Sequence, residues 1–190
     1  RSSMTSVETS LAHHFGNELF RYQPPRGSVG PYDSYEYAEK QITGDQYLAA
    51  LTAAIARMEA DFGTWKVAWG DMNRFQRNDS SIRQTFDDSK PSYPVKLGSG
   101  RWGALASVGT RQYPGTKNWY PTSGNSFIAS VEFGDKVRAK ALMAGGLNKD
   151  PASPHFFDQG EMYGTGTFRD VHYYREDVDA NIERQYHPGE

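Results

Sequence analysis

The clearest alternation of apolar and polar side chains predicts a β-hairpin. Residues 126–133 (SFIASVEF) alternate, and so do residues 136–144 (KVRAKALMA). Only Gly134 and Asp135 separate the two runs, and glycine at the first loop position favours a type II′ turn between antiparallel strands. The pattern therefore predicts a hairpin whose register is set by a two-residue turn.

A second pattern has the period of an amphipathic helix. Thr43 and Gln46 have the spacing of a capping box, and Gly63 is typical of a residue that ends a helix. Apolar residues recur at helical spacing between these ends, namely Tyr47, Leu48, Leu51, Ile55, Met58 and Phe62. We expect one helix from this segment.

Shorter patterns predict the other elements. Alternation predicts strands at Trp65–Trp69 (WKVAW), 102–108 and 171–174. A short helix is expected to begin in residues 156–163, and loops are expected at 80–100 and 111–124. Leu11–Phe20 is compatible with a short helix, but the prolines and glycines that follow favour loops. We therefore expect residues 1–42 to be a mostly irregular covering segment, and residues 43–190 to hold the helix and the strands.

The hairpin leads into a loop, Gly145–Gln159 (GGLNKDPASPHFFDQ), whose glycine pair and prolines exclude a strand or a regular helix. Within it, Asp158 follows His155 by three residues, so its carboxylate is able to orient the imidazole. The alternative is a histidine that stabilises the loop through a backbone hydrogen bond. We favour this alternative because no nucleophile accompanies the pair.

The other histidines and serines have weaker patterns. His13 and His14 are adjacent and lack the i, i+4 spacing of a helical metal pair. His172 and His187 have no supporting pattern. Ser126 follows Gly124–Asn125 outside any G-x-S-x-G elbow, so it is interpreted as a turn residue rather than a nucleophile.

Acidic and aromatic clusters are the remaining candidates. Neither Asp87–Asp88 nor the cluster of Glu176, Asp177 and Asp179 has the spacing of a calcium-binding loop, so exposed carboxylates are expected. Three aromatic side chains lie close together in the second loop: Tyr113, Trp119 and Tyr120. They form either a carbohydrate-stacking platform or a cover for the sheet, and we favour the cover.

Composition narrows the function classes. The formal net charge is −2 with both signs interspersed, which does not favour nucleic-acid binding. No cysteine is present, which excludes disulfides and thiol catalysis, and no apolar run is long enough for a transmembrane helix. The hydrophobic content of 37% is typical of a fragment that buries its faces against a partner polypeptide.

The order of hairpin, glycine pair and D-P-x-S-P-H-x-x-D-Q resembles the C-terminal signature of the penicillin acylase family. These N-terminal-nucleophile hydrolases include penicillin, cephalosporin and acyl-homoserine lactone acylases. The resemblance is carried by Gly124–Phe127, Val131–Gly134, Gly145–Gly146 and Asp150–Gln159, continues weakly in Tyr173–Asp177, and has an upstream W-G-x-x-x-R counterpart at Ala68–Phe75. It covers most of the chain after Lys40.

The resemblance implies an α+β fold, the C-terminal portion of a four-layer αββα sandwich with long ordered loops. It also implies an amidohydrolase whose terminal serine attacks the amide carbonyl, with the serine's own amino group as base and an asparagine in the oxyanion hole. None of these catalytic groups matches a position of this sequence. Arg1 is not a nucleophile, and we expect the serine and the asparagine upstream, in another part of the β chain.

The expected function is therefore that of the last segment of an acylase β chain, produced by an extra cleavage or as a fragment. The expected substrates are N-acyl amides, most of all acyl-homoserine lactones or β-lactam side chains. The expected partners are the α chain and the N-terminal part of the β chain, without which this chain is inactive. No cofactor, metal, nucleic acid or membrane is expected, and the family's usual location is the bacterial periplasm or the exterior. The alternative is a glycan-binding module that uses the Tyr and Trp loops.

Overall fold

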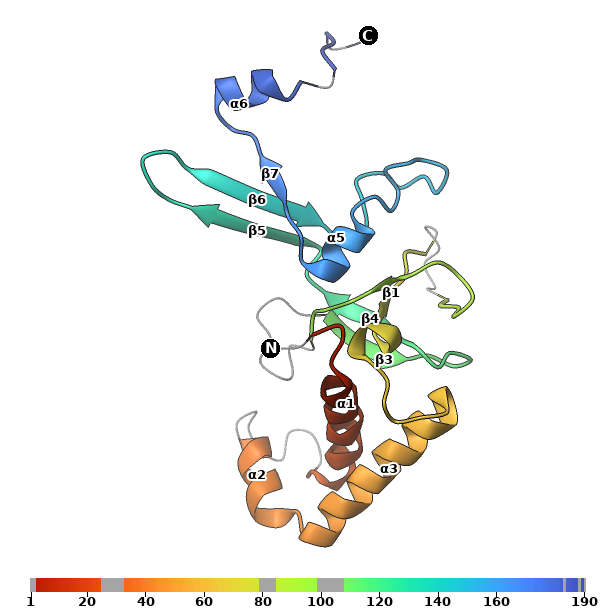
Figure 1. Ribbon diagram of the computed structural model, residues 1–190. Helices are drawn as coiled ribbons and strands as arrows, with labels where there is room; N and C mark the ends of the chain where they lie inside the picture. Colours follow the sequence, from red (N-terminus) through yellow and green to blue (C-terminus); the bar gives the residue numbers. More distant parts are fainter. Residues whose placement is uncertain are drawn as a thin grey trace.

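Helices and antiparallel strands occupy different regions of the chain, which places the fold in the α+β class (Figure 1). The computed structural model describes residues 3–24, 33–78, 85–98, 108–182, 184–187 and 189. The helices are α1 (Val7–Leu19), α2 (Asp33–Gln41), α3 (Gly44–Phe62), α4 (Trp69–Met72), α5 (Gly160–Thr165) and α6 (Arg175–Ala180). The strands are β1 (Arg74–Phe75), β2 (Tyr93–Pro94), β3 (Val108–Gln112), β4 (Trp119–Gly124), β5 (Phe127–Glu132), β6 (Arg138–Met143) and β7 (Arg169–Val171).

The predicted long helix is confirmed as α3. The Thr43 side chain accepts a hydrogen bond from the Gln46 backbone, and the Gln46 side chain accepts one from the Thr43 backbone. Gly63 ends the helix with a φ of 75°, a left-handed conformation that glycine adopts without strain. In the described residues, no helix is long and apolar enough to span a membrane.

The expectation of a mostly irregular segment over residues 1–42 is wrong. This segment contains α1, a 3₁₀ turn at Phe20–Tyr22, and α2. Helix α1 begins at Ser6, whose hydroxyl caps the Thr9 N–H at 3.0 Å, and it lies along α3 in Figure 1. Tertiary packing on α3 therefore extends the short helix expected at Leu11–Phe20 toward the N-terminus.

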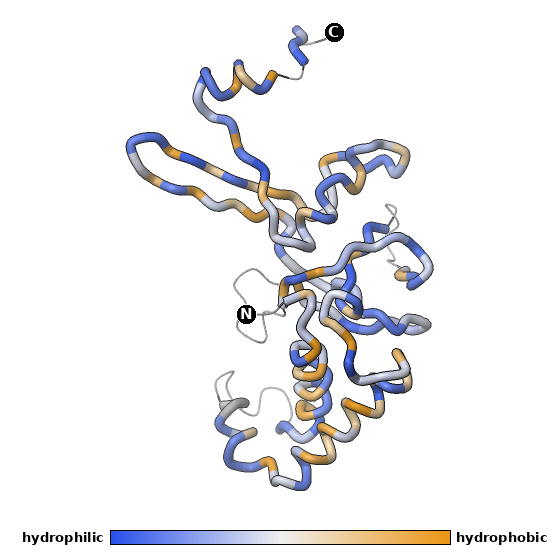
Figure 2. Tube along the Cα trace, in the orientation of Figure 1, coloured by the Kyte–Doolittle hydropathy of each residue, from blue (hydrophilic) through white to orange (hydrophobic). Residues whose placement is uncertain are grey.

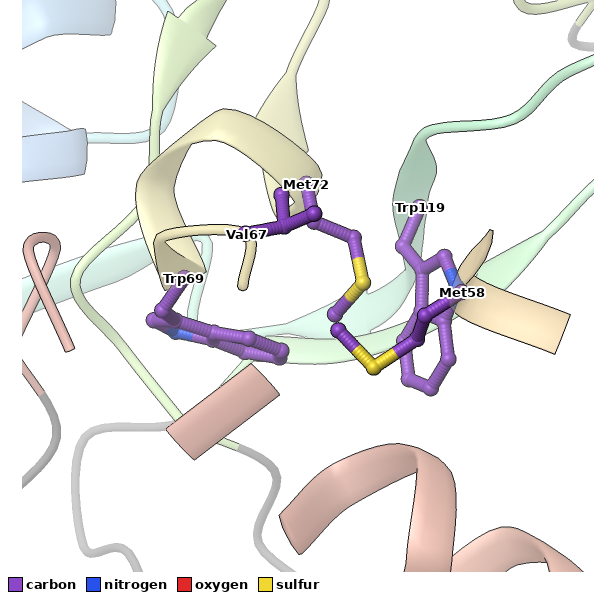
Figure 3. Packing of buried hydrophobic residues seen from close by; sticks show 5 residues of the cluster. All are labelled: Met58, Val67, Trp69, Met72 and Trp119. Carbon is purple, nitrogen blue, oxygen red and sulfur yellow. The ribbon is translucent and has the colours of Figure 1, made fainter. Parts of the chain in front are cut away.

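A cluster of indole rings and thioethers joins the helices to the strands. Its fully or nearly buried members are Met58, Val67, Trp69, Met72 and Trp119. Figure 3 shows the two thioether groups between the two indoles, whose centroids lie 6.3 Å apart at 77°. The strand expected at Trp65–Trp69 is wrong, because Trp69 starts the short helix α4 and its N–H donates to the Ser6 carbonyl.

Two small antiparallel sheets lie beside this cluster, β1 with β2 and β3 with β4. The loop expected over residues 111–124 is partly wrong, because β4 occupies its second half. Pro121 obscured the strand pattern, and it pairs with Thr110 where the register shifts, a position that tolerates a missing N–H. Most of the strand expected at 102–108 lies outside the described residues, although Val108 begins β3.

The predicted hairpin is confirmed, but its turn is not. Strands β5 and β6 pair from Phe127 with Met143 to Glu132 with Arg138, which leaves a five-residue loop. A type II′ turn needs a positive φ at its first loop residue, and Gly134 does not have one. Strand β7 completes the order β5-β6-β7 and ends at Val171, where the prediction began. Helix α5 overlaps only the second half of the helix expected at residues 156–163 and continues to Thr165.

The base of this sheet rests on a second apolar cluster, formed by Val95, Val108, Leu142 and Tyr163. From there the hairpin, β7 and α6 extend away from the helical part of the molecule (Figure 1). The Gly145–Gln159 loop leaves this base between β6 and α5. The buried apolar cluster therefore fixes the Gly145–Gln159 loop only at its base, where β6 ends and α5 begins.

We expect the Met58→Ala variant to lose about 2–5 kcal/mol of unfolding free energy, because it opens a cavity between the indoles of the fully buried cluster. Chemical denaturation of the full chain measures this loss. Leu48→Ala is the matched control on α3, since Leu48 is 63% exposed and its truncation should change stability by less than about 0.5 kcal/mol. Equal losses in both variants would contradict the assignment of the core.

Candidate functional site

The Gly145–Gln159 loop is closed at its base by Gln159. The Gln159 N–H donates to the Gly145 carbonyl at 2.8 Å, and the Met143 N–H donates to the side-chain oxygen of Gln159 at 2.9 Å. Gln159 is 1% exposed, so these bonds are shielded from water. The end of β6 and the start of α5 are therefore held together, and the chain between them forms a compact surface loop.

Arg77 fills the centre of this loop from a distant part of the sequence. Its guanidinium donates to the carbonyl oxygens of Gly146 at 3.3 Å, Asn148 at 3.0 Å and Phe156. Its Cζ also lies 4.2 Å from the centroid of the Phe156 ring. Burial lowers the pKa of Arg77, and the Asp158 carboxylate opposes that shift. An ammonium group has no planar fork of five donors, so this contact requires arginine.

The glycine pair allows this close approach. Gly145 has a φ of +93°, and a Cβ there would lie 3.0 Å from the Arg77 Cδ. A Cβ on Gly146 would lie 2.4 Å from the His155 carbonyl oxygen and 2.7 Å from the Asp158 carboxylate. The positive φ disfavours a side chain at Gly145, and the distances at Gly146 are shorter than real Cβ contacts, so both positions favour glycine for the loop to fold onto itself.

His155 and Asp158 meet, as their spacing predicts. The His155 Nδ1 lies 2.9 Å from the Asp158 Oδ2, and the side chains are 64% and 35% exposed. This contact is with a carboxylate, not with the backbone acceptor that we favoured. The Ser153 hydroxyl accepts from the His155 backbone N–H at 3.2 Å. The pair is therefore an oriented imidazole on a surface loop, and Ser153 serves the turn.

His13 and His14 lie in the interior of the protein. The His13 ring stacks on Trp69 at 4.2 Å, and the His14 Nε2 lies 3.0 Å from the Met72 sulfur. Burial lowers the pKa of each histidine to about 4, with a further lowering of the His13 pKa by His14. Both rings are neutral at pH 7 and form part of the core, which leaves them inaccessible to a ligand.

The acidic candidates support the structure of loops and of the surface. The Asp88 carboxylate accepts from the Tyr120 hydroxyl at 2.8 Å and from the Lys117 N–H at 2.7 Å, and Asp87 caps the turn at Ser89. The second cluster forms exposed ion pairs, Lys136 with Glu176 and Asp177 and Arg175 with Asp179. Within the described part of the chain, no group of three or more His, Cys, Asp or Glu side chains is arranged to hold a metal ion.

The aromatic residues of the second loop cover the sheet. Trp119 is 5% exposed and Tyr120 is not exposed, and burial raises the pKa of Tyr120 to about 12. The Tyr113 hydroxyl donates to the Pro121 carbonyl at 3.0 Å. The interpretation as a cover is correct, and the carbohydrate-stacking platform is wrong because the two buried rings offer no face to a ligand.

The remaining candidates are exposed. His172 and His187 lie on the surface, and Ser126 lies just before β5, where its carbonyl accepts from the Ala144 N–H at 2.8 Å. The sequence interpretation missed Arg77, Gln159 and Asn73. Asn73 is fully buried and donates to the carbonyls of Val95 and Leu97, which ties the Ala68–Phe75 segment to the β2 strand and its continuation. Asn73 directly follows one apolar residue, Met72, and no such signal precedes Arg77 or Gln159.

A family model described as penicillin amidase matches residues 9–180 of this chain. The match includes the loop, Arg77 and the hairpin, and it also includes the buried histidines of α1, where the sequence motifs offered little.

We expect Arg77→Lys to loosen the Gly145–Gln159 loop, because an ammonium group cannot satisfy three carbonyls in a fork. Amide hydrogen exchange over residues 145–158 should become about 10-fold faster. Arg138→Lys, at an exposed position on β6, is the control and should leave this exchange unchanged. Identical protection in the wild type and the Arg77 variant would show that the clamp does not order the loop.

The buried pair of His13 and His14 predicts that the free energy of unfolding decreases as the pH falls. Between pH 6.5 and 4 the unfolded chain binds protons that the folded His13 and His14 do not, so the contribution of these two residues to stability decreases as pH decreases and levels off below about 4. We expect His14→Gln to remove about 2 kcal/mol of the loss between pH 7 and 4.5, measured by urea unfolding. His172→Gln, at an exposed position, should have the same pH profile as the wild type. A profile for His14→Gln that runs parallel to that of the wild type would refute the assignment of His14 to the core.

Proposed function

Since the chain belongs to the penicillin amidase family, a family of amidohydrolases, we propose that it is the C-terminal segment of an acylase. The assembled enzyme hydrolyses N-acyl amide bonds, most of all those of acyl-homoserine lactones or β-lactam side chains. The observation that carries this proposal is the match over residues 9–180, supported by the ordered D-P-x-S-P-H-x-x-D-Q loop. The enzyme acts in the periplasm or outside the cell, as its relatives in this family commonly do.

In this proposal the nucleophile belongs to a companion polypeptide. The family's terminal serine hydroxyl adds to the amide carbonyl while its amino group takes the proton, the amine leaves with that proton, and water then releases the acid. In the described residues, the Asp158 carboxylate orients the His155 imidazole. The hydroxyl of the nearby Ser153 accepts a hydrogen bond from the His155 backbone N–H. The chain therefore contributes architecture to the enzyme, and its companion contributes the reacting groups.

The companion is the α chain together with the N-terminal part of the β chain. Large apolar side chains along the hairpin are exposed, among them Phe127 at 57% and Phe133 at 83%. A water-exposed hairpin with such residues is typical of a sheet that continues into a neighbouring polypeptide. We propose that β5 to β7 complete one sheet of a four-layer αββα sandwich in this way.

The enzyme purified with all its polypeptides tests this function. It should hydrolyse a chromogenic N-acyl amide, and replacing the terminal serine of the companion by alanine should abolish turnover. His155→Asn and Asp158→Asn should each change kcat by less than about 10-fold, because a general base would contribute about 100-fold or more. A loss of 100-fold or more in kcat with unchanged KM and stability would place the reaction in this loop and contradict the proposal.

A further inference from the structure

Strand β7 is shorter than its sequence pattern. Alternation predicts a strand over residues 171–174, and valine and tyrosine favour strands. The ladder with β6 nevertheless ends at the pair of Val171 with Ala139. If the same register continued, Tyr173 would lie directly opposite Val137. The chain therefore leaves the sheet although its next residues are suited to extend β7.

The Val137 N–H lies on the edge of β6 that faces β7. Successive residues of an antiparallel strand direct their hydrogen-bonding groups to opposite sides. The Ala144 N–H donates to the Ser126 carbonyl at 2.8 Å, on the side of β5. The Met143 N–H donates to Gln159 at 2.9 Å, on the other side. Because the pairing with β5 continues from residue 138 to 143 without a bulge, the odd-numbered Val137 faces the same side as Met143.

A side chain from beyond β7 occupies this donor. We call residues 172–182 the C-terminal segment, and it includes α6. The Val137 N–H donates to the Tyr174 hydroxyl at 2.8 Å. The phenol oxygen therefore takes the place that the Tyr173 carbonyl would have in a longer ladder.

Charged contacts hold the C-terminal segment in this position. Lys136 forms ion pairs with Glu176 at 2.9 Å and with Asp177 at 3.1 Å, and its Nζ lies 4.7 Å from the centroid of the Tyr174 ring. The Lys136 side chain is 43% exposed and both carboxylates are also exposed. Water and salt weaken such pairs, so a second arrangement with similar free energy is able to compete with this one.

The C-terminal segment borders a cavity of about 590 Å³ on one face of the sheet. Directly paired residues share a face and successive residues alternate, and Figure 2 shows this alternation of hydropathy along the hairpin. The residues that line the cavity from the sheet include five polar residues of one face, namely Ser130, Glu132, Arg138, Lys140 and Asp170. Tyr174 and Asp177 line it from the C-terminal segment. Moving this segment into the sheet would remove that part of the cavity wall.

We propose that β7 and the C-terminal segment form a two-state element. In the observed state, Tyr174 accepts from the Val137 N–H and the segment borders the cavity. In the extended state, Tyr173 pairs with Val137, β7 is two residues longer, and the polar face is open to solvent. The change exchanges the Tyr174 hydrogen bond and the ion pairs of Lys136 for two backbone hydrogen bonds. It is a property of this chain and does not depend on the acylase function.

Tyr174→Phe tests the two states, because it removes the hydroxyl that accepts from Val137 and keeps the ring. Amide hydrogen exchange of single residues is measured by NMR on the full chain. We expect the Tyr173 amide to exchange at least about 10-fold more slowly in the variant, because it donates to the Val137 carbonyl in the extended state. The Val137 amide should change by less than about 3-fold, since it only exchanges one acceptor for another.

The matched control is Tyr173→Phe, which removes a hydroxyl from the neighbouring ring, 79% exposed, and should leave the exchange of Val137 unchanged. Two results for Tyr174→Phe would overturn the inference. Faster exchange at Val137 without added protection at Tyr173 would show that the segment only frays. Unchanged exchange at both amides would show that the hydroxyl does not determine the position of the segment.

Lys136→Gln tests the charged contacts separately, because it removes both ion pairs and leaves the Tyr174 hydroxyl in place. The Tyr173 amide should exchange about 2-fold more slowly or less rapidly still, and about 0.5 M NaCl should have the same effect on the wild type. Arg175→Gln removes an ion pair within α6, with Asp179, and should leave this amide unchanged. Equal protection in the two variants, or faster exchange in Lys136→Gln, would contradict the role of Lys136 in the observed state.

Discussion

The insertion of Arg77 into the Gly145–Gln159 loop is the contact on which the rest of the architecture depends. Arg77 follows β1, whose Phe75 packs on the second apolar cluster at the base of the three-stranded sheet. The Arg77 guanidinium adds three hydrogen bonds to carbonyl groups of the loop to this apolar contact. The glycine pair follows from this contact, because a side chain at either position would collide with Arg77 or with the returning loop.

Local patterns in the sequence were sufficient where neighbouring residues decide the structure. Helix α3 follows from its capping box and its period, and the hairpin follows from its alternation. The hairpin turn failed because its geometry depends on contacts elsewhere: the Val137 N–H donates to the Tyr174 hydroxyl at 2.8 Å, and Lys136 pairs with Glu176. These contacts hold residues 136 and 137 out of the ladder and lengthen the loop.

Elements whose structure depends on distant residues were beyond prediction from the sequence. In the candidate site, the spacing of His155 and Asp158 allowed their contact although we favoured a backbone acceptor, whereas nothing near Arg77 indicates a partner 79 positions away. The WKVAW segment alternates like a strand, but Trp69 is fully buried among residues of α1, α3 and β4, and this burial outweighs the local preference. Pro121 obscured β4 for a similar reason, since only its pairing with β3 defines it as a strand.

The architectural role that we propose for the loop agrees with its contacts. A catalytic imidazole needs a nucleophile within hydrogen-bond reach, and the structure places beside His155 a carboxylate and a serine hydroxyl that accepts from the backbone. The same loop ends at Gln159, whose side chain accepts from the Met143 N–H at the end of β6, where β6 pairs with β5. A shift of one residue in this register would exchange the two faces of the hairpin and turn Ile128 and Leu142 away from the apolar cluster around Tyr163. The Gly145–Gln159 loop therefore begins and ends at the base of the sheet, where Gln159 and the apolar cluster around Tyr163 hold β6.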